Sequence, residues 1–143
     1  MHETYMQRCI ELAKEAKAKG DVPVGSLVLQ GETIVAEAYE IVPSTRTVTG
    51  YAEIIAVQKA CDALGTMNLQ DCTLYTTAEP CWMCTYAIRE TGIAQVVIGS
   101  KTLDVGAIST KYKLLTDDTI TVWGAPPTIV MGVLEAECDA LRD

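Results

Sequence analysis

The sequence predicts an α/β protein, a three-layer α/β/α sandwich around a mixed five-stranded sheet. Helix-periodic and strand-like segments alternate along the chain, which is typical of helices that cover a sheet. Two strand-like runs near the N-terminus flank a turn at Gly31 and Glu32, which predicts one antiparallel hairpin ahead of parallel crossovers. The 143 residues predict a single domain, residues 1–143.

The N-terminal third is expected to form a helix and the hairpin. Apolar side chains recur at helical spacing over 4–19, and Gly20 ends this amphipathic helix. The hairpin strands are expected over 26–30 and 33–39. A loop rich in Thr, Ser and Pro follows over 40–50.

The middle of the chain predicts a helix, a strand and a second helix. The first helix is expected over 51–63, closed by Gly65. The run CTLYTT, residues 72–77, is rich in β-branched and aromatic residues and predicts a strand. The next helix is expected from near Pro80, which suits a first helical turn, to a C-cap at Gly92.

The C-terminal third is less regular. AQVVIGS, residues 94–100, predicts a fourth strand, and the residues 101–119 that follow show no clear period. TITVW, residues 119–123, is expected to form a fifth strand at a sheet edge, and a helix is expected from about residue 129 onward.

Composition and charge limit the function classes. The formal net charge is −8, with 19 acidic and 11 basic residues, whereas nucleic-acid binding usually needs a basic stripe. A small-molecule substrate is therefore expected, and a nucleic-acid partner is not. No apolar run approaches the roughly 18 residues of a membrane span, and the N-terminus lacks the order of a signal peptide. A cytoplasmic location is expected.

The six cysteines are expected to be reduced, because the chain has no secretory signal and no dense cysteine framework. Four of them fall on apolar faces of expected elements and are interpreted as small buried hydrophobes: Cys9, Cys61, Cys72 and Cys138. Cys81 and Cys84 differ, because Cys-x-x-Cys places both thiols on one side of a first helical turn.

Candidate catalytic groups stand at the starts of two expected helices. One helix begins near Tyr51 and carries Glu53, and the other begins near Pro80 and carries Cys81 and Cys84. Both follow connections at strand ends, where open α/β sheets place their sites. A helix N-terminus favours the thiolate, which binds metal. Two thiolates, one further ligand and a water would give a four-coordinate catalytic zinc site, with a nearby carboxylate to move protons.

These residues resemble the cytidine-deaminase-like superfamily. Its zinc signature is His-x-Glu followed by Pro-Cys-x-x-Cys, and this chain has Tyr51-Ala52-Glu53 and Pro80-Cys81-Trp82-Met83-Cys84. The resemblance is closest to the branch of tRNA adenosine deaminases, guanine deaminases and bacterial nucleoside deaminases. It covers most of the chain, through VPVGSLVL (22–29), CTLYTTAEPCWMC (72–84), IAQVVIGS (93–100) and, more weakly, GVLEAECDAL (132–141).

The resemblance implies an activity, a cofactor and roles for residues. Cys81 and Cys84 would be ligands of Zn²⁺, and Glu53 would shuttle protons without binding the metal. The reaction would be the hydrolytic loss of ammonia from an aromatic C–NH₂ group of a heterocyclic small molecule. Glu53 would take a proton from water and deliver protons to the ring nitrogen and the leaving amine. Relatives form dimers, so a homodimer is expected by analogy.

Tyr51 stands where the superfamily has its histidine ligand. A phenol must lose its proton to bind metal well, and its ordinary pKa is about 10. Three interpretations stay open: a phenolate ligand in a weakened zinc site, a site that holds zinc poorly or not at all, and a Tyr51 side chain turned aside while water or another group completes the shell. The chain's one histidine, His2, is a poor candidate for a substitute because it lies near the terminus.

Glu40 is a second departure from the pattern. In EAYE it occupies the position where relatives usually have an asparagine that touches the substrate. An ionised carboxylate only accepts hydrogen bonds, so Glu40 predicts a preference for rings that present N–H donors, such as guanine, isocytosine or amino-triazines. The alternative is a solvent-facing loop residue.

Three other side chains have a functional and a structural interpretation. Trp82, inside Cys-x-x-Cys, could stack on a base, and Trp123 could cover the site, but packing explains each equally well. Glu79 is expected to cap the following helix, because acidic side chains favour a helix N-terminus.

Three functions therefore compete. The first is a zinc-dependent deaminase of a nucleobase, nucleoside or related amino-heterocycle. The second is a catalytically weakened or inactive deaminase-fold protein that binds a ligand, because Tyr51 replaces the histidine. The third, least favoured, is a thiol–disulfide oxidoreductase that uses Cys81 and Cys84, since it leaves Glu53 without a role.

Overall fold

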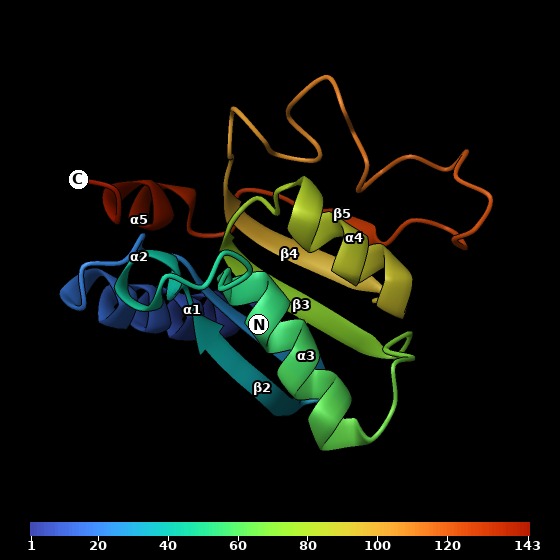
Figure 1. Ribbon diagram of the computed structural model, residues 1–143, viewed down its shortest axis with the longest axis horizontal. Helices are drawn as coiled ribbons and strands as arrows, with labels where there is room; N and C mark the ends of the chain where they lie inside the picture. The colour runs from blue at the N-terminus through green and yellow to red at the C-terminus, as the bar shows by residue number, and fades with distance from the viewer.

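A computed structural model describes all residues 1–143 (Figure 1). Its helices and strands, in chain order, are α1 (His2–Ala18), β1 (Gly25–Gln30), β2 (Thr33–Tyr39), α2 (Val42–Thr45), α3 (Ala52–Leu64), β3 (Cys72–Ala78), α4 (Trp82–Thr91), β4 (Gln95–Ser100), β5 (Thr128–Val130) and α5 (Glu135–Ala140). No helix is both long and apolar enough to cross a membrane.

The five strands form one mixed sheet in the order β2-β1-β3-β4-β5. β1 pairs antiparallel with β2 and with β3, whereas the β3–β4 and β4–β5 pairs are parallel. The expected hairpin is therefore present, and the two parallel pairs follow it. This arrangement brings the C-terminal ends of β3 and β4 together at one edge, where α4 begins.

Helices cover both faces of the sheet, which confirms the three-layer α/β/α class (Figure 1). Alternate residues of each strand point to opposite faces. On one face α3 and α4 pack on side chains that include Val28, Leu74 and Val96. On the other face α1 and α5 pack on side chains that include Leu27 and Val97.

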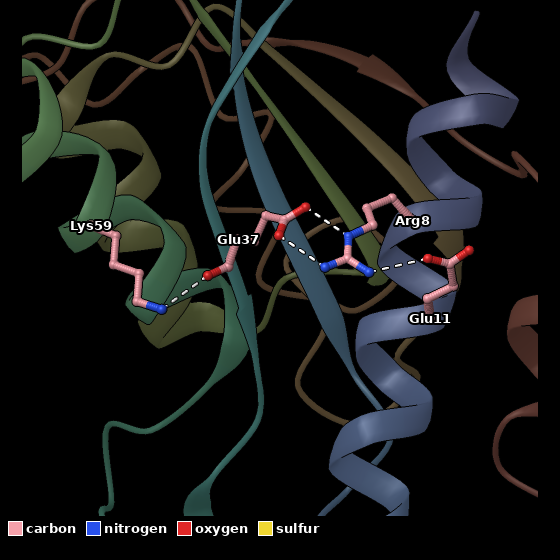
Figure 2. A network of polar contacts seen from close by, with 4 residues as sticks. All are labelled: Arg8, Glu11, Glu37 and Lys59. Carbon is pink, nitrogen blue, oxygen red and sulfur yellow. Dashed lines mark hydrogen bonds and ion pairs between the residues drawn. The ribbon is translucent and has the colours of Figure 1, made fainter.

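Polar side chains also tie β2 to the helices beside it. The guanidinium of Arg8 on α1 donates two hydrogen bonds, of 2.7 and 3.0 Å, to the carboxylate of Glu37 on β2 and one of 3.1 Å to Glu11 (Figure 2). The Lys59 ammonium on α3 donates to the backbone oxygen of Glu37. Arg8 keeps the pKa of the Glu37 carboxyl below its usual value through these bonds.

One expected element near the C-terminus, the strand over 119–123, is wrong. Residues 119–123 form no strand, and the fifth strand is instead β5, Thr128–Val130. Residues 119–123 have strand propensity, but the Trp123 indole lies against α4, where it donates to Glu90 and packs edge-on against Tyr86 at 5.4 Å. Tertiary contacts thus override the local preference.

The last helix begins later than expected, and the loop before α3 is more ordered. The expected start near residue 129 falls in β5, and Gly132 and Leu134 then have positive φ values of 79° and 52°, so α5 starts only at Glu135. Within the expected loop 40–50, residues 42–45 form the one-turn helix α2. The buried Asp21 carboxylate fixes α2 by accepting hydrogen bonds from the Ser44 amide and hydroxyl, both 2.7 Å.

Candidate active site

A cavity of about 420 Å³ opens where α3 and α4 begin. This volume is within the range of roughly 300–1,000 Å³ that is typical of small-molecule sites. The lining includes residues from six parts of the chain: Val22 with Val24, Glu40, Tyr51 with Glu53, Glu79 with Cys81, segment 101–105, and Arg142. The structure therefore brings the expected carboxylate and one of the two expected thiols to a single cavity.

Glu53 lies in the first turn of α3, directly after its N-cap residue Tyr51 and Ala52. Only 4% of Glu53 is exposed. Burial raises the pKa of its carboxyl to about 8, and the negative charges of Cys81 and Glu40 add to the effect. A carboxyl with this pKa can both accept and release a proton near neutral pH, as a general acid/base must.

The two thiols lie at the start of α4, with Cys81 as its N-cap and Cys84 in its first turn. Their Sγ atoms are 3.6 Å apart and share a hydrogen bond. This bond, followed by the backbone N–H groups of Cys84 and Met83, lowers the pKa of Cys81 to about 6. The same bond and burial raise the pKa of Cys84 far above its usual value. The pair thus holds one negative charge, on the Cys81 sulfur.

The geometry of the thiol pair fits zinc. Two sulfur ligands at about 2.3 Å from a tetrahedral zinc ion are about 3.8 Å apart, and the Sγ atoms of Cys81 and Cys84 are 3.6 Å apart. No group of three or more His, Cys, Asp and Glu side chains is arranged to hold a metal ion. Beyond the two thiols, the side chain at the superfamily's third ligand position is the Tyr51 phenol, which also lines the cavity.

Tyr51 is the weakest candidate metal ligand among Tyr51, Cys81 and Cys84. Burial raises the pKa of its phenol above the ordinary value, and the negative charges of Cys81 and Glu40 act in the same direction. The phenol therefore keeps its proton in the metal-free protein, whereas a neutral imidazole could bind a metal without losing one. Cys81 can bind the metal as the thiolate it already is, whereas Cys84 and Tyr51 must each lose a proton on binding.

Glu40 follows β2 and lines the same cavity. It is 6% exposed, and burial raises the pKa of its carboxyl to about 7, with further contributions from the negative charges of Asp21 and Cys81. No protein group donates a hydrogen bond to this carboxylate or lowers its pKa. A buried carboxylate without a protein donor can accept hydrogen bonds from a ligand. The solvent-facing alternative for Glu40 is wrong, because the side chain is buried.

Glu79 does not cap α4, and this expectation is wrong. Its carboxylate, 1% exposed, turns instead toward the segment after β4. It accepts hydrogen bonds from the backbone N–H groups of Thr102, Ile108 and Ser109, at 3.3, 2.7 and 2.8 Å, and from the Ser109 hydroxyl at 2.5 Å. Several backbone donors in a loop outcompete the first turn of one helix, whose N-cap residue Cys81 has no side-chain cap.

The sequence of residues 1–100 matches the family described as "Cytidine and deoxycytidylate deaminase zinc-binding region". This range contains Tyr51, Glu53, Cys81 and Cys84. The chain belongs to this family. It is therefore a member of the cytidine-deaminase-like superfamily, and its relatives that are named deaminases are hydrolases that act on C–N bonds.

Individual relatives agree with the family. The chain is 37% identical over 140 residues to a tRNA-specific adenosine deaminase of Bacillus subtilis, which covers 97% of this chain and 84% of the relative. It is 41% identical over 88 residues to a guanine deaminase of the same organism, which covers 61% and 56% of the two chains. A structure solved in a study of A-to-I editing by tRNA:A34 deaminases superposes with a TM-score of 0.89 at 26% identity, covering 96% of this chain and 98% of the other.

The tryptophans of this deaminase-family chain lie outside the cavity lining. The Trp82 indole donates to the backbone oxygen of Tyr112 at 3.2 Å and packs edge-on against its ring at 5.5 Å. Trp123 lines a separate surface groove beside Met67. A substrate contact for Trp82 stays a prediction. His2 is bonded to the Tyr75 hydroxyl at 2.8 Å and is not among the lining residues either.

Sequence reasoning missed the residues of the cavity mouth. Lys101, Asp104 and Arg142 line it, and the Arg142 guanidinium donates to Ser100 Oγ at 3.0 Å and to the Lys101 backbone oxygen at 2.9 Å. The available signal was the end of the strand-like run at Ser100, because side chains that follow parallel strands gather at one edge of a sheet. Nothing in the local sequence indicates that Arg142, at the C-terminus, joins them.

Proposed function

We propose that this protein is a zinc-dependent hydrolytic deaminase of a nucleobase, nucleoside or related amino-heterocycle of the guanine, isocytosine or cytosine type. One observation carries the proposal. The buried Glu53 carboxyl lies with Cys81, one of two thiols spaced for zinc, on a cavity large enough for a heterocycle. Membership of the deaminase family supports the same reaction.

The residues of the chain would divide the work as follows. Cys81 and Cys84 would hold the zinc ion, with Tyr51 at the third position. When bound, zinc supplies a water whose pKa falls to about 7, so that hydroxide is available at neutral pH. Glu53 would accept the proton of this water and pass protons to the ring nitrogen and then to the amino group. Water adds to the ring carbon, the C–NH₂ bond breaks, and ammonia leaves while a ring carbonyl remains.

Glu40 would select among substrates. Its carboxylate is buried in the cavity and has no protein donor, so an N–H group of the ring would satisfy it. We therefore expect guanine-like and isocytosine-like rings to react faster than cytosine. In Glu40→Gln the amide can also donate, so the preference over cytosine should fall about tenfold. Unchanged relative rates would overturn this role for Glu40.

The direct test is metal analysis together with ammonia release. The purified protein is expected to contain about one zinc per chain after zinc supplementation, because the thiols are placed for it. It is expected to release ammonia from at least one compound of a panel of cytosine, guanine, isocytosine, adenine, their nucleosides and amino-triazines. Removal of zinc with a chelator should abolish the release, and re-addition should restore it. Ammonia release that survives chelation would overturn the zinc mechanism.

A second candidate is a deaminase-fold protein that binds a heterocycle without turning it over. The specific observation in its favour is the Tyr51 phenol, whose pKa is raised by burial at the position of a metal ligand. Binding of isocytosine or guanine without zinc and without ammonia release would favour this candidate. Although a similar relative is named for tRNA, we propose a free heterocycle as the ligand, because the net charge of −8 opposes phosphate binding.

A further inference from the structure

One wall of the cavity is a loop, and Glu79 holds it in place. Residues 101–105 line the cavity and follow β4 without forming a helix or strand. Glu79 lies between the end of β3 and the start of α4, two residues before the thiol of Cys81. The same short stretch of chain therefore carries a candidate metal ligand and the anchor of the wall.

The Glu79 carboxylate is saturated by this loop. A carboxylate offers about four acceptor positions, and the three backbone N–H groups and one hydroxyl between Thr102 and Ser109 supply four hydrogen bonds. No arginine or lysine takes part in this set, and Glu79 forms no ion pair. The Glu79 carboxylate therefore orders the backbone of this loop and pairs with no basic side chain.

The contact is too close for a side chain at position 106. A Cβ atom added to Gly106 would lie 2.3 Å from Glu79 Oε2 and 2.2 Å from the Thr102 backbone oxygen. Gly106 also pairs with Cys81 in an isolated antiparallel bridge, and the Ala107 amide donates to the Pro80 backbone oxygen at 3.0 Å. The wall is therefore fixed to the residues around the Cys81 thiol through backbone as well as through Glu79.

We propose that Glu79 is a positioning residue of this site. Its carboxylate holds the loop 102–109 in place, and residues 102–105 of this loop form the wall that encloses the heterocycle. The proposal rests on the proposed function for the identity of the ligand. Glu79 does not touch the reacting atoms; it determines where the wall stands. Loss of the anchor should weaken the enclosure of the ligand more than it slows the chemical step.

Glu79→Gln tests the anchor with the least change in shape. An amide has one accepting oxygen and one donating nitrogen, so at least one backbone N–H of the loop would face another donor. We expect the Ile108 and Ser109 amides to exchange hydrogen with solvent at least about tenfold faster. We expect KM for isocytosine to rise about tenfold, which corresponds to about 1.4 kcal/mol, with kcat changed by less than about threefold and zinc content unchanged.

Gly106→Ala should produce the same changes by a different route, since the added methyl group displaces the loop from an intact carboxylate. Glu90→Gln is the matched control. Glu90 is exposed on α4 and accepts one hydrogen bond, from the Trp123 indole, which the amide oxygen of Gln can still accept. Amide exchange of the loop and KM should both stay at wild-type values in this control.

The outcomes separate this proposal from the proposed function. If the wild type releases no ammonia, the proposed function fails, and the dissociation constant for isocytosine then replaces KM with the same expected tenfold rise. The positioning role is overturned if the loop amides exchange faster while KM or the dissociation constant is unchanged, or if only kcat falls. It is also overturned if neither Glu79→Gln nor Gly106→Ala folds, because Glu79 would then serve folding alone. A wild type that neither converts nor binds any panel compound overturns both proposals.

Discussion

Tyr51 stands at the third ligand position of the proposed zinc site, beside the thiol of Cys81. Its phenol must lose a proton to bind, and burial beside the Cys81 charge opposes that loss. We predict that Tyr51→His raises zinc affinity at least about tenfold, because imidazole binds in its neutral form. Competition with a chromogenic chelator measures the affinity, and ammonia release from the panel should rise with it.

Tyr51→Phe is the control for this substitution, since it keeps the ring and removes the oxygen. Zinc affinity lower than in the wild type would make Tyr51 a phenolate ligand. Equal affinity would mean that water or another group completes the shell. If Tyr51→His restores neither zinc nor activity, the tyrosine is not the defect.

Glu53 is predicted to act on the chemical step alone. Glu53→Gln keeps the shape of the side chain but removes its ability to accept and return a proton, so kcat should fall about 10²- to 10⁴-fold. Isocytosine binding, measured by calorimetry, should weaken by less than about threefold. Glu32→Gln, an exposed change in the β1–β2 turn, is the matched control. A variant that loses binding as strongly as turnover would contradict the assigned role.

Glu40 is predicted to make folding pH-dependent. Its pKa is about 7 in the folded chain against an ordinary value of 4.5, so the unfolded chain loses this proton at lower pH than the folded chain does. Stability should therefore fall as pH rises from about 4.5 to 7 and level off above, by about 1–2 kcal/mol from this group. Urea unfolding of metal-free wild type and Glu40→Gln, at several pH values, measures it. Parallel stability curves for the two proteins would contradict the prediction.

At the scale of elements, Arg89 anchors the segment between β4 and β5 to α4. The guanidinium is 5% exposed and donates to the backbone oxygens of Leu114, Asp117 and Gly124, at 2.7, 2.9 and 3.3 Å. It also lies 5.0 Å from the centre of the Trp123 ring. One buried side chain thus replaces the ladder of hydrogen bonds that a strand would provide.

Arg89→Met is predicted to lower the free energy of unfolding by about 2–3 kcal/mol, because three backbone oxygens lose a charged donor. Arg8→Met is the control on α1, where the arginine side chain is 38% exposed and binds the Glu37 and Glu11 carboxylates (Figure 2). Its cost should be about 1 kcal/mol or less. Urea unfolding measures both, and limited proteolysis should cleave residues 114–124 faster only in Arg89→Met. Equal costs for the two variants would contradict this.

Regular elements and their order could be predicted because their signals are local. The apolar spacing of α1, the turn at Gly31 and the stop at Gly92 each act within a few residues. The true fifth strand could not be predicted from local signals. β5 has only three residues, directly after two prolines, and its partner β4 lies about thirty positions earlier in the chain. Residues 119–123 were misplaced because Trp123 packs on α4.

The residues of the candidate site also fall into two groups: those that a local pattern indicates, and those whose role depends on the fold. Glu53, Cys81 and Cys84 stand at fixed offsets from helix starts, so a short pattern indicates them. Glu79 stands in that pattern too, but its partners lie more than twenty residues further along the chain, and only the fold shows that it holds a loop. The raised pKa of Glu40, to about 7, likewise depends on burial and on the charges of Asp21 and Cys81, which come from distant parts of the chain.

At the scale of the whole molecule, the negative charge of the chain favours a free heterocycle over RNA as the ligand. The net charge is −8, and three carboxylates that line the cavity, those of Glu40, Glu53 and Glu79, are buried. Only Lys101 and Arg142 bring positive charge to the cavity mouth, where Asp104 offsets one of them. A protein that binds RNA neutralises several phosphates with basic side chains, and its affinity then falls steeply with salt.

We therefore predict no binding of an RNA stem-loop of about 17 nucleotides at about 150 mM salt, measured by fluorescence anisotropy up to micromolar protein. Turnover of the preferred free base should change by less than about twofold between 50 and 200 mM salt, because the reacting ring carries no phosphate. Lys101→Gln, which removes a cation from the mouth, should leave this turnover unchanged. Tight RNA binding with a steep salt dependence that Lys101→Gln reduces would contradict the prediction. It would assign the mouth to a phosphate backbone despite the acidity of the chain.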